Sequence, residues 1–125
     1  MSIGVVVLTV PWPPATNNLH AVVRGRKVLS KAGREYRGKV AAACAAQGAP
    51  RLGRARLRVS VSAFPPDRRR RDLDNLNKAV LDALVFARVF DDDSQVDDLR
   101  IVRGEPVKDG CLQVAIEVLE GRVAA

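Results

Sequence analysis

Residues 54–87, RARLRVSVSAFPPDRRRRDLDNLNKAVLDALVFA, change their hydrophobic period from two to about 3.6 within one continuous segment. Over residues 54–64, apolar side chains alternate with arginine and serine, which is the pattern of a strand with one buried face. Two prolines then end the strand, because proline lacks the amide that sheet pairing needs. From Leu73 to Ala87, apolar residues recur at helical spacing. We therefore predict a strand that leads through a basic loop into a helix.

The predicted helix has one main apolar stripe and a second, smaller apolar surface. At 100° per residue, a group of apolar side chains falls within about 40° of one line and should face the sheet. They are Leu73, Leu76, Val80, Leu84 and Ala87. Asp74 and Lys78 lie on a different side, with Leu81 and Val85 beneath them, so another layer or a partner subunit should cover that side. Leu81 and Val85 are therefore candidates for a dimer interface.

Outside this segment we expect further strands and one more helix. They are strands over residues 3–10, 99–102 and 112–119, a short strand over 21–23, and a helix from Ser30 to Gly48. Ser30 can accept a hydrogen bond at the helix start, and Gly48 suits the helix end. A turn at Asp109 and Gly110 indicates that the last two strands form a hairpin. The order of elements predicts one compact α+β domain over residues 1–125, with helices packed on a mixed or antiparallel sheet.

Charge is distributed unevenly along the 125 residues. The net charge is +7, and the 47% apolar content excludes a disordered chain. Residues 1–71 carry 15 basic side chains against two acids, whereas residues 72–125 carry six basic side chains against 12 acids. This polarity suits a surface that binds a polyanion beside an acidic pocket. Charge that only keeps the protein soluble is the alternative.

The sequence does not indicate a metal–thiolate site, a signal peptide or a membrane span. Cys44, Cys111 and His20 lie at no metal-ligand spacing, so we expect reduced thiols. The apolar N-terminal run has no basic residue before it and no cleavage pattern after it. No segment approaches the roughly 20 apolar residues of a membrane helix. We therefore expect a cytoplasmic protein with no membrane partner.

Acidic residues stand at both ends of the predicted helix. Asp72 and Asp74 stand at its start, and the run DDD at 91–93 follows its end. Each has a structural explanation: Asp72 can cap the helix, Asp74 can favour the helix dipole, and Lys78 can pair with acids one turn away. The DDD run can be a solvated turn. If Asp72, Asp74 and Asp93 converge, however, carboxylates about 4 Å apart repel by about 4 kcal/mol in a partly shielded site, so a positive charge must neutralise them.

A cluster of those three carboxylates would suit magnesium, which prefers oxygen ligands and keeps several waters for a phosphate-bearing substrate. Magnesium held beside a basic surface can support hydrolysis of a phosphodiester. Lys78 would then offset charge in the transition state or orient the attacking water. The run Arg68 to Arg71 would hold neighbouring phosphates. A calcium-binding EF-hand is excluded, because the segment lacks the glycine and the closing glutamate of that loop.

The segment PDRRRRDLDNLNKAVLDAL, followed by DDSQV and a basic strand, resembles the RusA-type Holliday junction resolvases of bacteria and phages. The opening strand that ends in PWPP, the TNN after it, and RGRKVLSKAGREYR are also similar to that family, so the resemblance covers nearly the whole chain. It implies a compact α+β fold and a homodimer. It also implies a magnesium- or manganese-dependent enzyme of DNA recombination and repair, which nicks four-way junctions symmetrically beside a CC dinucleotide.

The resemblance also implies roles for single residues. Asp72, Asp74 and Asp93 match the metal-binding and catalytic aspartates of the family, Lys78 matches an essential lysine, and Arg71 matches an arginine that handles DNA. We expect further DNA contacts from the rest of the arginine run and from the loop that precedes it. The residues concerned are Arg68, Arg69, Arg70 and Asn18.

The sequence departs from the family pattern in three places. Ala15 is an extra residue in the loop after PWPP, Arg88 replaces a common helix-ending glycine, and Asp91 adds an acid before the usual pair. Because Arg88 replaces that glycine, the family pattern does not predict the conformation of the turn that leads to Asp93. A shift of one residue would make Asp92 the third ligand.

Two other functions stay open. One is a non-catalytic DNA-binding module, in which the arginines bind phosphate and the acids are caps and turns. The other is a nuclease for a different branched structure, such as a flap.

A junction resolvase must make two nicks related by a two-fold axis, and this chain has one acidic cluster. The junction hypothesis therefore requires a homodimer.

Overall fold

Strand β4 (Leu57–Phe64) lies inside the main sheet and organises its topology. The computed structural model describes residues 4–15 and 20–119. In it, β4 pairs in parallel with β5 (Val96–Arg103) and antiparallel with β6 (Cys111–Val118). Strand β6 also pairs antiparallel with β1 (Val5–Pro11), which gives the order β1-β6-β4-β5. The mixed sheet of the predicted α+β fold is therefore confirmed.

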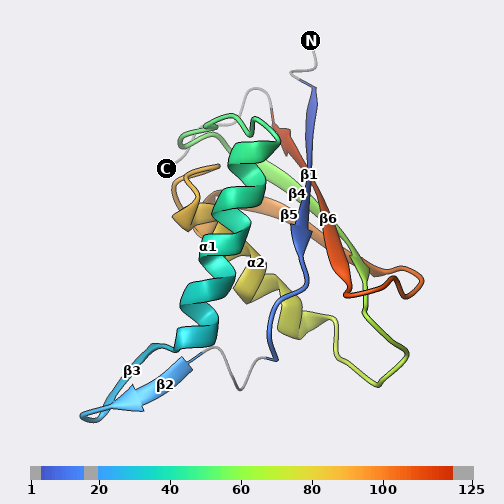
Figure 1. Ribbon diagram of the computed structural model, residues 1–125. Coiled ribbons are helices and arrows are strands. Elements are labelled where there is room, and N and C mark those ends of the chain that lie inside the picture. Colours follow the sequence, from blue (N-terminus) through green and yellow to red (C-terminus); the bar gives the residue numbers. More distant parts are fainter. Residues whose placement is uncertain (1–3, 16–19, 120–125) are drawn as a thin grey trace.

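The core lies between one face of this sheet and two helices, α1 (Lys31–Ala46) and α2 (Asp74–Phe86) (Figure 1). The alternation in β4 determines which face of the sheet the helices cover, because every second side chain of the strand is buried. Three strands contribute fully buried side chains to the core. They are Leu57, Val59, Val61 and Ala63 of β4, Leu112, Val114 and Ile116 of β6, and Leu8 and Val10 of β1. The result is a two-layer α+β domain.

The predicted hairpin between the last two strands is wrong. Strands β5 and β6 lie on opposite sides of β4 and do not pair with each other. The reason is α2, because a helix that follows β4 returns the chain to the start of that strand, and the next strand then runs parallel to it. The chain crosses the end of β4 afterwards, where the amide of Val107 donates to the carbonyl of Pro65 at 2.9 Å. The predicted turn at 109–110 exists, with positive φ at both residues, but it leads into β6 only.

Both predicted helices are present. Ser30 caps α1 as expected, since its hydroxyl accepts a hydrogen bond from the amide of Gly33 at 3.0 Å. The stripe predicted for α2 is buried at Leu76, Val80 and Leu84. In the part of the chain that the structure describes, no helix combines the length and the hydropathy of a membrane span.

The second apolar surface of α2 is largely covered within the chain. Leu81 is only 7% exposed, and Val85 is half-buried. Helix α2 packs on α1 as well as joining the core, so its buried arc is wider than a single stripe. Leu81 is therefore a core residue, and its expected place in a dimer interface is wrong.

A separate two-stranded sheet precedes α1. It pairs β2 (His20–Val23) with β3 (Arg26–Leu29), of which the sequence predicts only the first. The turn residues Arg24 and Gly25 have φ of 52° and 76°, the left-handed geometry that a two-residue hairpin loop requires. Figure 1 shows this hairpin projecting away from the main sheet and the helices.

Two glycines give opposite predictions for substitution by alanine. Gly38 is exposed within α1, and no described atom lies within 4 Å of the place a Cβ would take. Gly38→Ala should raise the free energy of unfolding by about 0.5–1 kcal/mol, because alanine loses less backbone entropy in a helix. At Gly104, a Cβ would lie 2.5 Å from Cε1 of Phe64, so Gly104→Ala should lower it by about 1–3 kcal/mol. Urea unfolding checks both, and a neutral Gly104→Ala would contradict the packing at the end of β4.

Candidate active site

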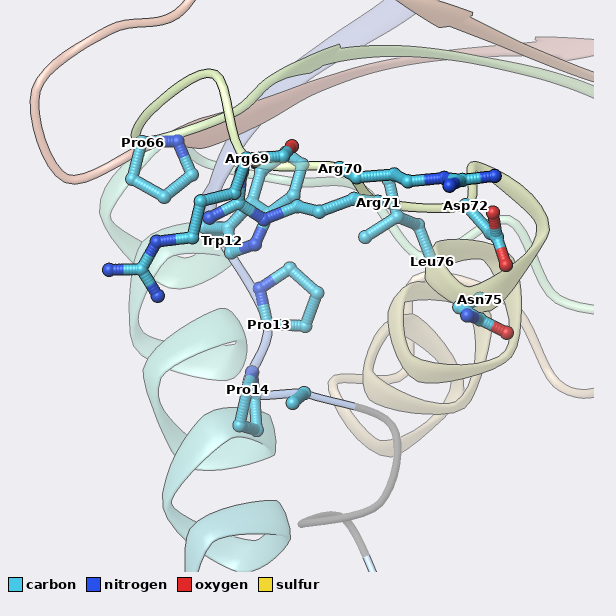
Figure 2. A pocket seen from close by; sticks show the side chains of 11 residues that line it. Trp12, Pro13, Pro14, Pro66, Arg69, Arg70, Arg71, Asp72, Asn75 and Leu76 are labelled. Atoms are coloured by element: carbon cyan, nitrogen blue, oxygen red, sulfur yellow. Dashed lines mark hydrogen bonds between the residues drawn. The ribbon is translucent and has the colours of Figure 1, made fainter.

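A cleft of about 720 Å³ opens where the chain leaves β1 and where the loop after β4 leads into α2. Residues 12–15 line one side, and residues 66, 69–72, 75 and 76 line the other. Figure 2 shows Trp12, the arginines and Asp72 around this opening. An aromatic ring, three guanidinium groups and a carboxylate thus share one cleft, although they come from segments far apart in the sequence.

Arg71 is the most firmly held of the four arginines. Its Nη1 lies 2.8 Å from Oδ1 of Asp67 and also donates to the carbonyls of Asp67 and Arg69. The guanidinium carbon stands 5.7 Å from the centre of the Trp12 ring, within the range of a cation–π contact. The hydrogen bond from Arg71, with a second from the amide of Arg69, lowers the pKa of Asp67. Asp67 thus stays ionised and fixes Arg71 against the cleft wall.

The other arginines of the run are more exposed. Arg69 pairs with Asp67 at 3.5 Å, and Arg68 pairs with Glu105 at 3.1 Å, both at the surface. Arg70 has no hydrogen bond or ion pair within the described ranges, and it lines the cleft. Arg69 and Arg70 are therefore cations that an incoming anion can reach. Asn18 lies outside the described residues.

Asp72 and Asp74 are exposed carboxylates at the start of α2. Asp72 lines the cleft, whereas Asp74 is the first helical residue. The alternative role of Asp72 as a helix cap is not present, because the N-cap position belongs to Leu73 and no side chain caps the helix there. Neither carboxylate makes a hydrogen bond or an ion pair among residues 4–15 and 20–119. Two unneutralised acids therefore stand directly after the arginine run.

Lys78 links the middle of α2 to the acidic run that follows the helix. Its Nζ lies 3.3 Å from Oδ1 of Asp82 and 3.5 Å from Oδ2 of Asp93. The negative charge of Asp82, and after it that of Asp93, raises the pKa of Lys78. The expected pair with Asp82 is thus present, and Asp93 is the member of the DDD run that reaches α2.

Asp92 has a structural role in the short 3₁₀ turn η2 (Asp93–Gln95). Its carboxylate accepts hydrogen bonds from the amide of Ser94, at 3.0 Å, and from the Ser94 hydroxyl. These bonds lower the pKa of Asp92. Asp92 and Gln95 together form a capping box, in which each side chain binds the backbone at the other end of the turn.

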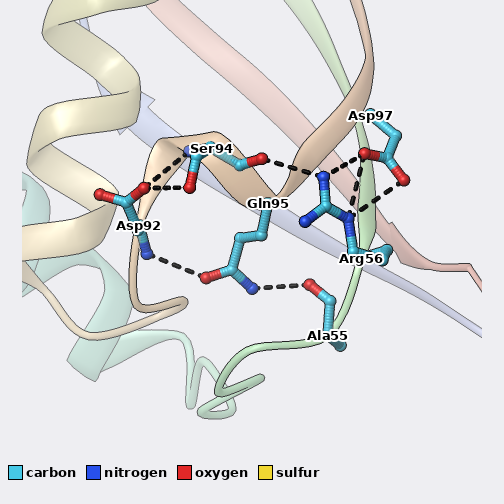
Figure 3. A network of polar contacts seen from close by, with 6 residues as sticks. All are labelled: Ala55, Arg56, Asp92, Ser94, Gln95 and Asp97. Carbon is cyan, nitrogen blue, oxygen red and sulfur yellow. Dashed lines mark hydrogen bonds and ion pairs between the residues drawn. The ribbon is translucent and has the colours of Figure 1, made fainter. Parts of the chain in front are cut away.

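Gln95 is a supporting residue that our sequence analysis missed. The side chain is 3% exposed, and its Oε1 accepts from the amides of Asp91 and Asp92 at 3.0 and 2.9 Å. Its Nε2 donates to the carbonyl of Gly53 at 2.9 Å and to that of Ala55 at 2.6 Å. Figure 3 shows the contacts of Gln95 with Ala55 and Asp92. The D-x-x-Q spacing of a capping box could have identified it. Gln95 fixes the segment that carries Asp93 to the loop before β4.

The remaining acids of this region pair with arginines of the sheet. Arg56 binds Asp97 and the carbonyl of Ser94, and Arg58 binds Asp98 at 2.9 Å. These pairs are partly exposed and lie along the β4–β5 ladder. Asp97 and Asp98 therefore have structural partners at the surface of the sheet.

The donor set suits a hard divalent cation in its chemistry, because Asp72, Asp74 and Asp93 offer only oxygen. Their predicted convergence is not present, however. No three His, Cys, Asp or Glu side chains of the described residues lie close enough to hold a metal ion. Asp93 faces the ammonium of Lys78 instead, while Asp72 and Asp74 point to solvent from the helix start.

A cleft that combines basic, aromatic and acidic side chains is typical of an enzyme that acts on a phosphate-bearing polymer. Comparison with known proteins agrees with that class. The family model described as endodeoxyribonuclease RusA matches residues 11–119 of this chain. The chain therefore belongs to the RusA family of endodeoxyribonucleases.

Relatives occur in bacteria and in phages. A crossover junction endodeoxyribonuclease RusA of Escherichia coli (strain K12) is 41% identical over 110 residues, which cover 87% of this chain and 91% of that protein. The protein of the same name in Enterobacteria phage 82 has the same identity and coverage. The one in Enterobacteria phage HK97 is 38% identical over 88% of this chain and 92% of its own length.

Gln95→Glu tests the support for the Asp93 segment. Glutamate keeps the shape of the side chain but loses both donors, so the carbonyls of Gly53 and Ala55 would face an oxygen. We expect the free energy of unfolding to fall by about 2–3 kcal/mol. Gln113→Glu is the matched control, because Gln113 is exposed on β6 and should change stability by less than about 0.5 kcal/mol. Equal losses in the two variants would show that Gln95 has no special structural role.

Proposed function

We propose that this cleft binds branched DNA and that the acids beside it cut one strand of a four-way junction. The proposal rests on one observation above all, the placement of Arg69, Arg70 and Arg71 in the same cleft as Asp72, directly before α2. Arginines that hold phosphates would bring a phosphodiester to carboxylates that would otherwise repel it. The names of the relatives, crossover junction endodeoxyribonucleases, support this choice of substrate.

The arginines would act in two ways. Arg71, held by Asp67 and Trp12, would position the DNA backbone, because its guanidinium has little freedom. Arg69 and Arg70 would follow the phosphates on either side, because both are exposed. Arg68 and Asn18 complete the proposed DNA contacts, and Arg68 would have to leave its exposed pair with Glu105.

Asp72, Asp74 and Asp93 would hold a divalent cation, Mg²⁺ in the first place, with Mn²⁺ able to replace it. A cation of this kind polarises a phosphoryl oxygen and lowers the pKa of a bound water. Lys78 would separate from Asp93 and remain beside Asp82, where its positive charge can offset the charge that develops on the phosphate. Closure of the three carboxylates around the cation is therefore part of the proposal.

Asp93 is preferred to Asp92 as the third ligand. One carboxylate oxygen of Asp92 already accepts two hydrogen bonds from Ser94 and stabilises the turn. Asp93 has only an exposed ion pair with Lys78 to give up. The loss of an exposed pair costs at most about 1 kcal/mol, whereas the loss of a cap costs about 0.5–2 kcal/mol.

The active species would be a homodimer in the bacterial cytoplasm, encoded by a host or a phage. A symmetric dimer would supply two copies of the cleft for the two nicks that a junction requires. Half-buried Val85 remains a candidate for the interface.

Substitution of the first two acids tests the catalytic proposal. Asp72→Asn and Asp74→Asn should each slow single-turnover cleavage of a synthetic four-way junction in magnesium at least about a hundredfold, since each removes a charged ligand. Both variants should bind the junction as tightly as the unchanged protein, or more tightly, because repulsion of the phosphates falls. Cleavage at the unchanged rate would favour a non-catalytic DNA-binding module. Equal rates on four-way, three-way and linear duplexes would rule out selectivity for junctions.

The DDD run offers an internal control for the third ligand. Asp93→Asn should abolish cleavage, whereas Asp91→Asn should leave both cleavage and stability unchanged, because Asp91 is exposed. Asp92→Asn should retain cleavage and change the free energy of unfolding by less than about 0.5 kcal/mol, because the amide oxygen of asparagine can cap the turn in place of the carboxylate. Loss of cleavage in Asp92→Asn, with Asp93→Asn active, would assign the ligand to Asp92. Junction cleavage and urea unfolding of the three variants give both readouts.

A further inference from the structure

The β2–β3 hairpin stands away from the core and is fixed to it at its base. Arg34 in the first turn of α1 donates to the carbonyl of Leu29 at 2.8 Å, and the cap of Ser30 follows at once. The rest of the hairpin extends beyond the helices (Figure 1). An isolated two-stranded ribbon is marginally stable in water, so a surface that receives it would stabilise it.

The hairpin is basic and unusually apolar for an exposed element. It carries Arg24, Arg26 and Lys27, and residues 20–29 contain no acid. All three cations are exposed, and none forms an ion pair within the described part of the chain. On the opposite strand, Val22 pairs with Lys27 and is 76% exposed, and Val23 pairs with Arg26 and is 52% exposed. Charge of one sign with exposed methyl groups fits a polyanion that also offers apolar contacts, and DNA has both phosphates and base edges.

The dimensions of the hairpin suit a groove of duplex DNA. Two antiparallel strands lie about 5 Å apart, and four residues per strand reach about 13 Å from the base to the turn. The major groove of B-DNA is about 12 Å wide and admits a two-stranded ribbon, where thymine methyl groups can contact small apolar side chains. The hairpin could therefore enter the groove with its cations against the flanking phosphates.

The hairpin base is continuous with the candidate active site. His20 and Leu29 line a hollow of about 350 Å³ between α1 and α2, and Lys78 and Asp82 line the same hollow. A duplex held by the hairpin would therefore extend along the side of the molecule on which Lys78 lies. This position differs from that of the cleft formed by Trp12 and the arginine run.

We propose that the β2–β3 hairpin is a second DNA-contacting element, which enters the groove of a duplex arm next to the cut strand. The inference rests on the proposed function, since it assumes that branched DNA is the substrate. It adds a contact that grips a duplex arm, whereas the arginine cleft holds the strand to be cut.

Removal of the hairpin charge tests this contact. Arg26→Gln/Lys27→Gln should raise the Kd for a four-way junction about tenfold and reduce the slope of log Kd against log salt by about 2, because two phosphate contacts are lost. Binding to a single-stranded oligonucleotide of the same length should change less than twofold, because it has no duplex groove. Fluorescence anisotropy at several salt concentrations measures both quantities.

Arg51→Gln/Arg54→Gln is the matched control. It removes the same charge from exposed positions in the loop after α1, at the other end of a 16-residue helix about 24 Å long. This control should change junction affinity by less than about twofold. Equal effects of the two double variants, or an equal loss on single-stranded DNA, would overturn the hairpin contact.

Failure of the hairpin proposal can be told apart from failure of the proposed function. If the unchanged protein cuts the junction and the hairpin variant binds the junction with the same Kd and salt slope, only the hairpin proposal fails. If the unchanged protein neither binds nor cuts the junction, the proposed function and the hairpin proposal both fail. Sedimentation of the hairpin variant is also informative, because a change from dimer to monomer would assign the hairpin to a second copy of the chain instead of DNA.

Discussion

Two parallel strands can be joined only by a chain that crosses back over the sheet, and this constraint sets the layout of the whole domain. Helix α2 is the crossover between β4 and β5, so the basic loop that precedes it must leave from the carboxyl end of β4. Strand β1 runs in the same direction as β4, since both are antiparallel to β6. The carboxyl ends of β1 and β4 therefore lie at the same end of the sheet. This is why Trp12 meets the arginine loop in a single cleft.

The same crossover separates the acids. A helix of 13 residues is about 20 Å long, so Asp72 and Asp74 stand at one end of it and the DDD run leaves from the other. The long side chain of Lys78 covers part of this distance and reaches Asp93. Close approach of all three carboxylates requires more than the fold of one chain supplies at rest. Under the proposed function a bound cation would have to draw them together, because substrate phosphates repel carboxylates.

Much of the fold followed from hydrophobic periods, and the misses have physical causes. The alternation in β4 and the stripe of α2 depend on burial, which leaves a strong imprint in the sequence. Strand β3 depends on a turn at Arg24 and Gly25 and contributes no side chain to the hydrophobic core, so its residues show no such imprint. The pairing of β5 was missed because a turn at 109–110 is compatible with a hairpin as well as with a crossing loop. Within the site, the sequence identified the charged residues but not their partners. The contacts of Asp92 with Ser94 and of Asp93 with Lys78 depend on the turn that follows α2, which the sequence did not predict.

Lys78 also affects how the acidic side chains are neutralised when no metal cation is present. Carboxylates gathered to bind a metal usually repel one another in its absence, and many such sites are destabilised until the ion arrives. Here the ammonium group of Lys78 lies between Asp82 and Asp93 and serves as an internal counter-ion. The segment that carries Asp93 therefore has its own counter-ion, and under the proposed function a metal ion would bind at Asp93 in exchange for an ion pair that the chain already makes.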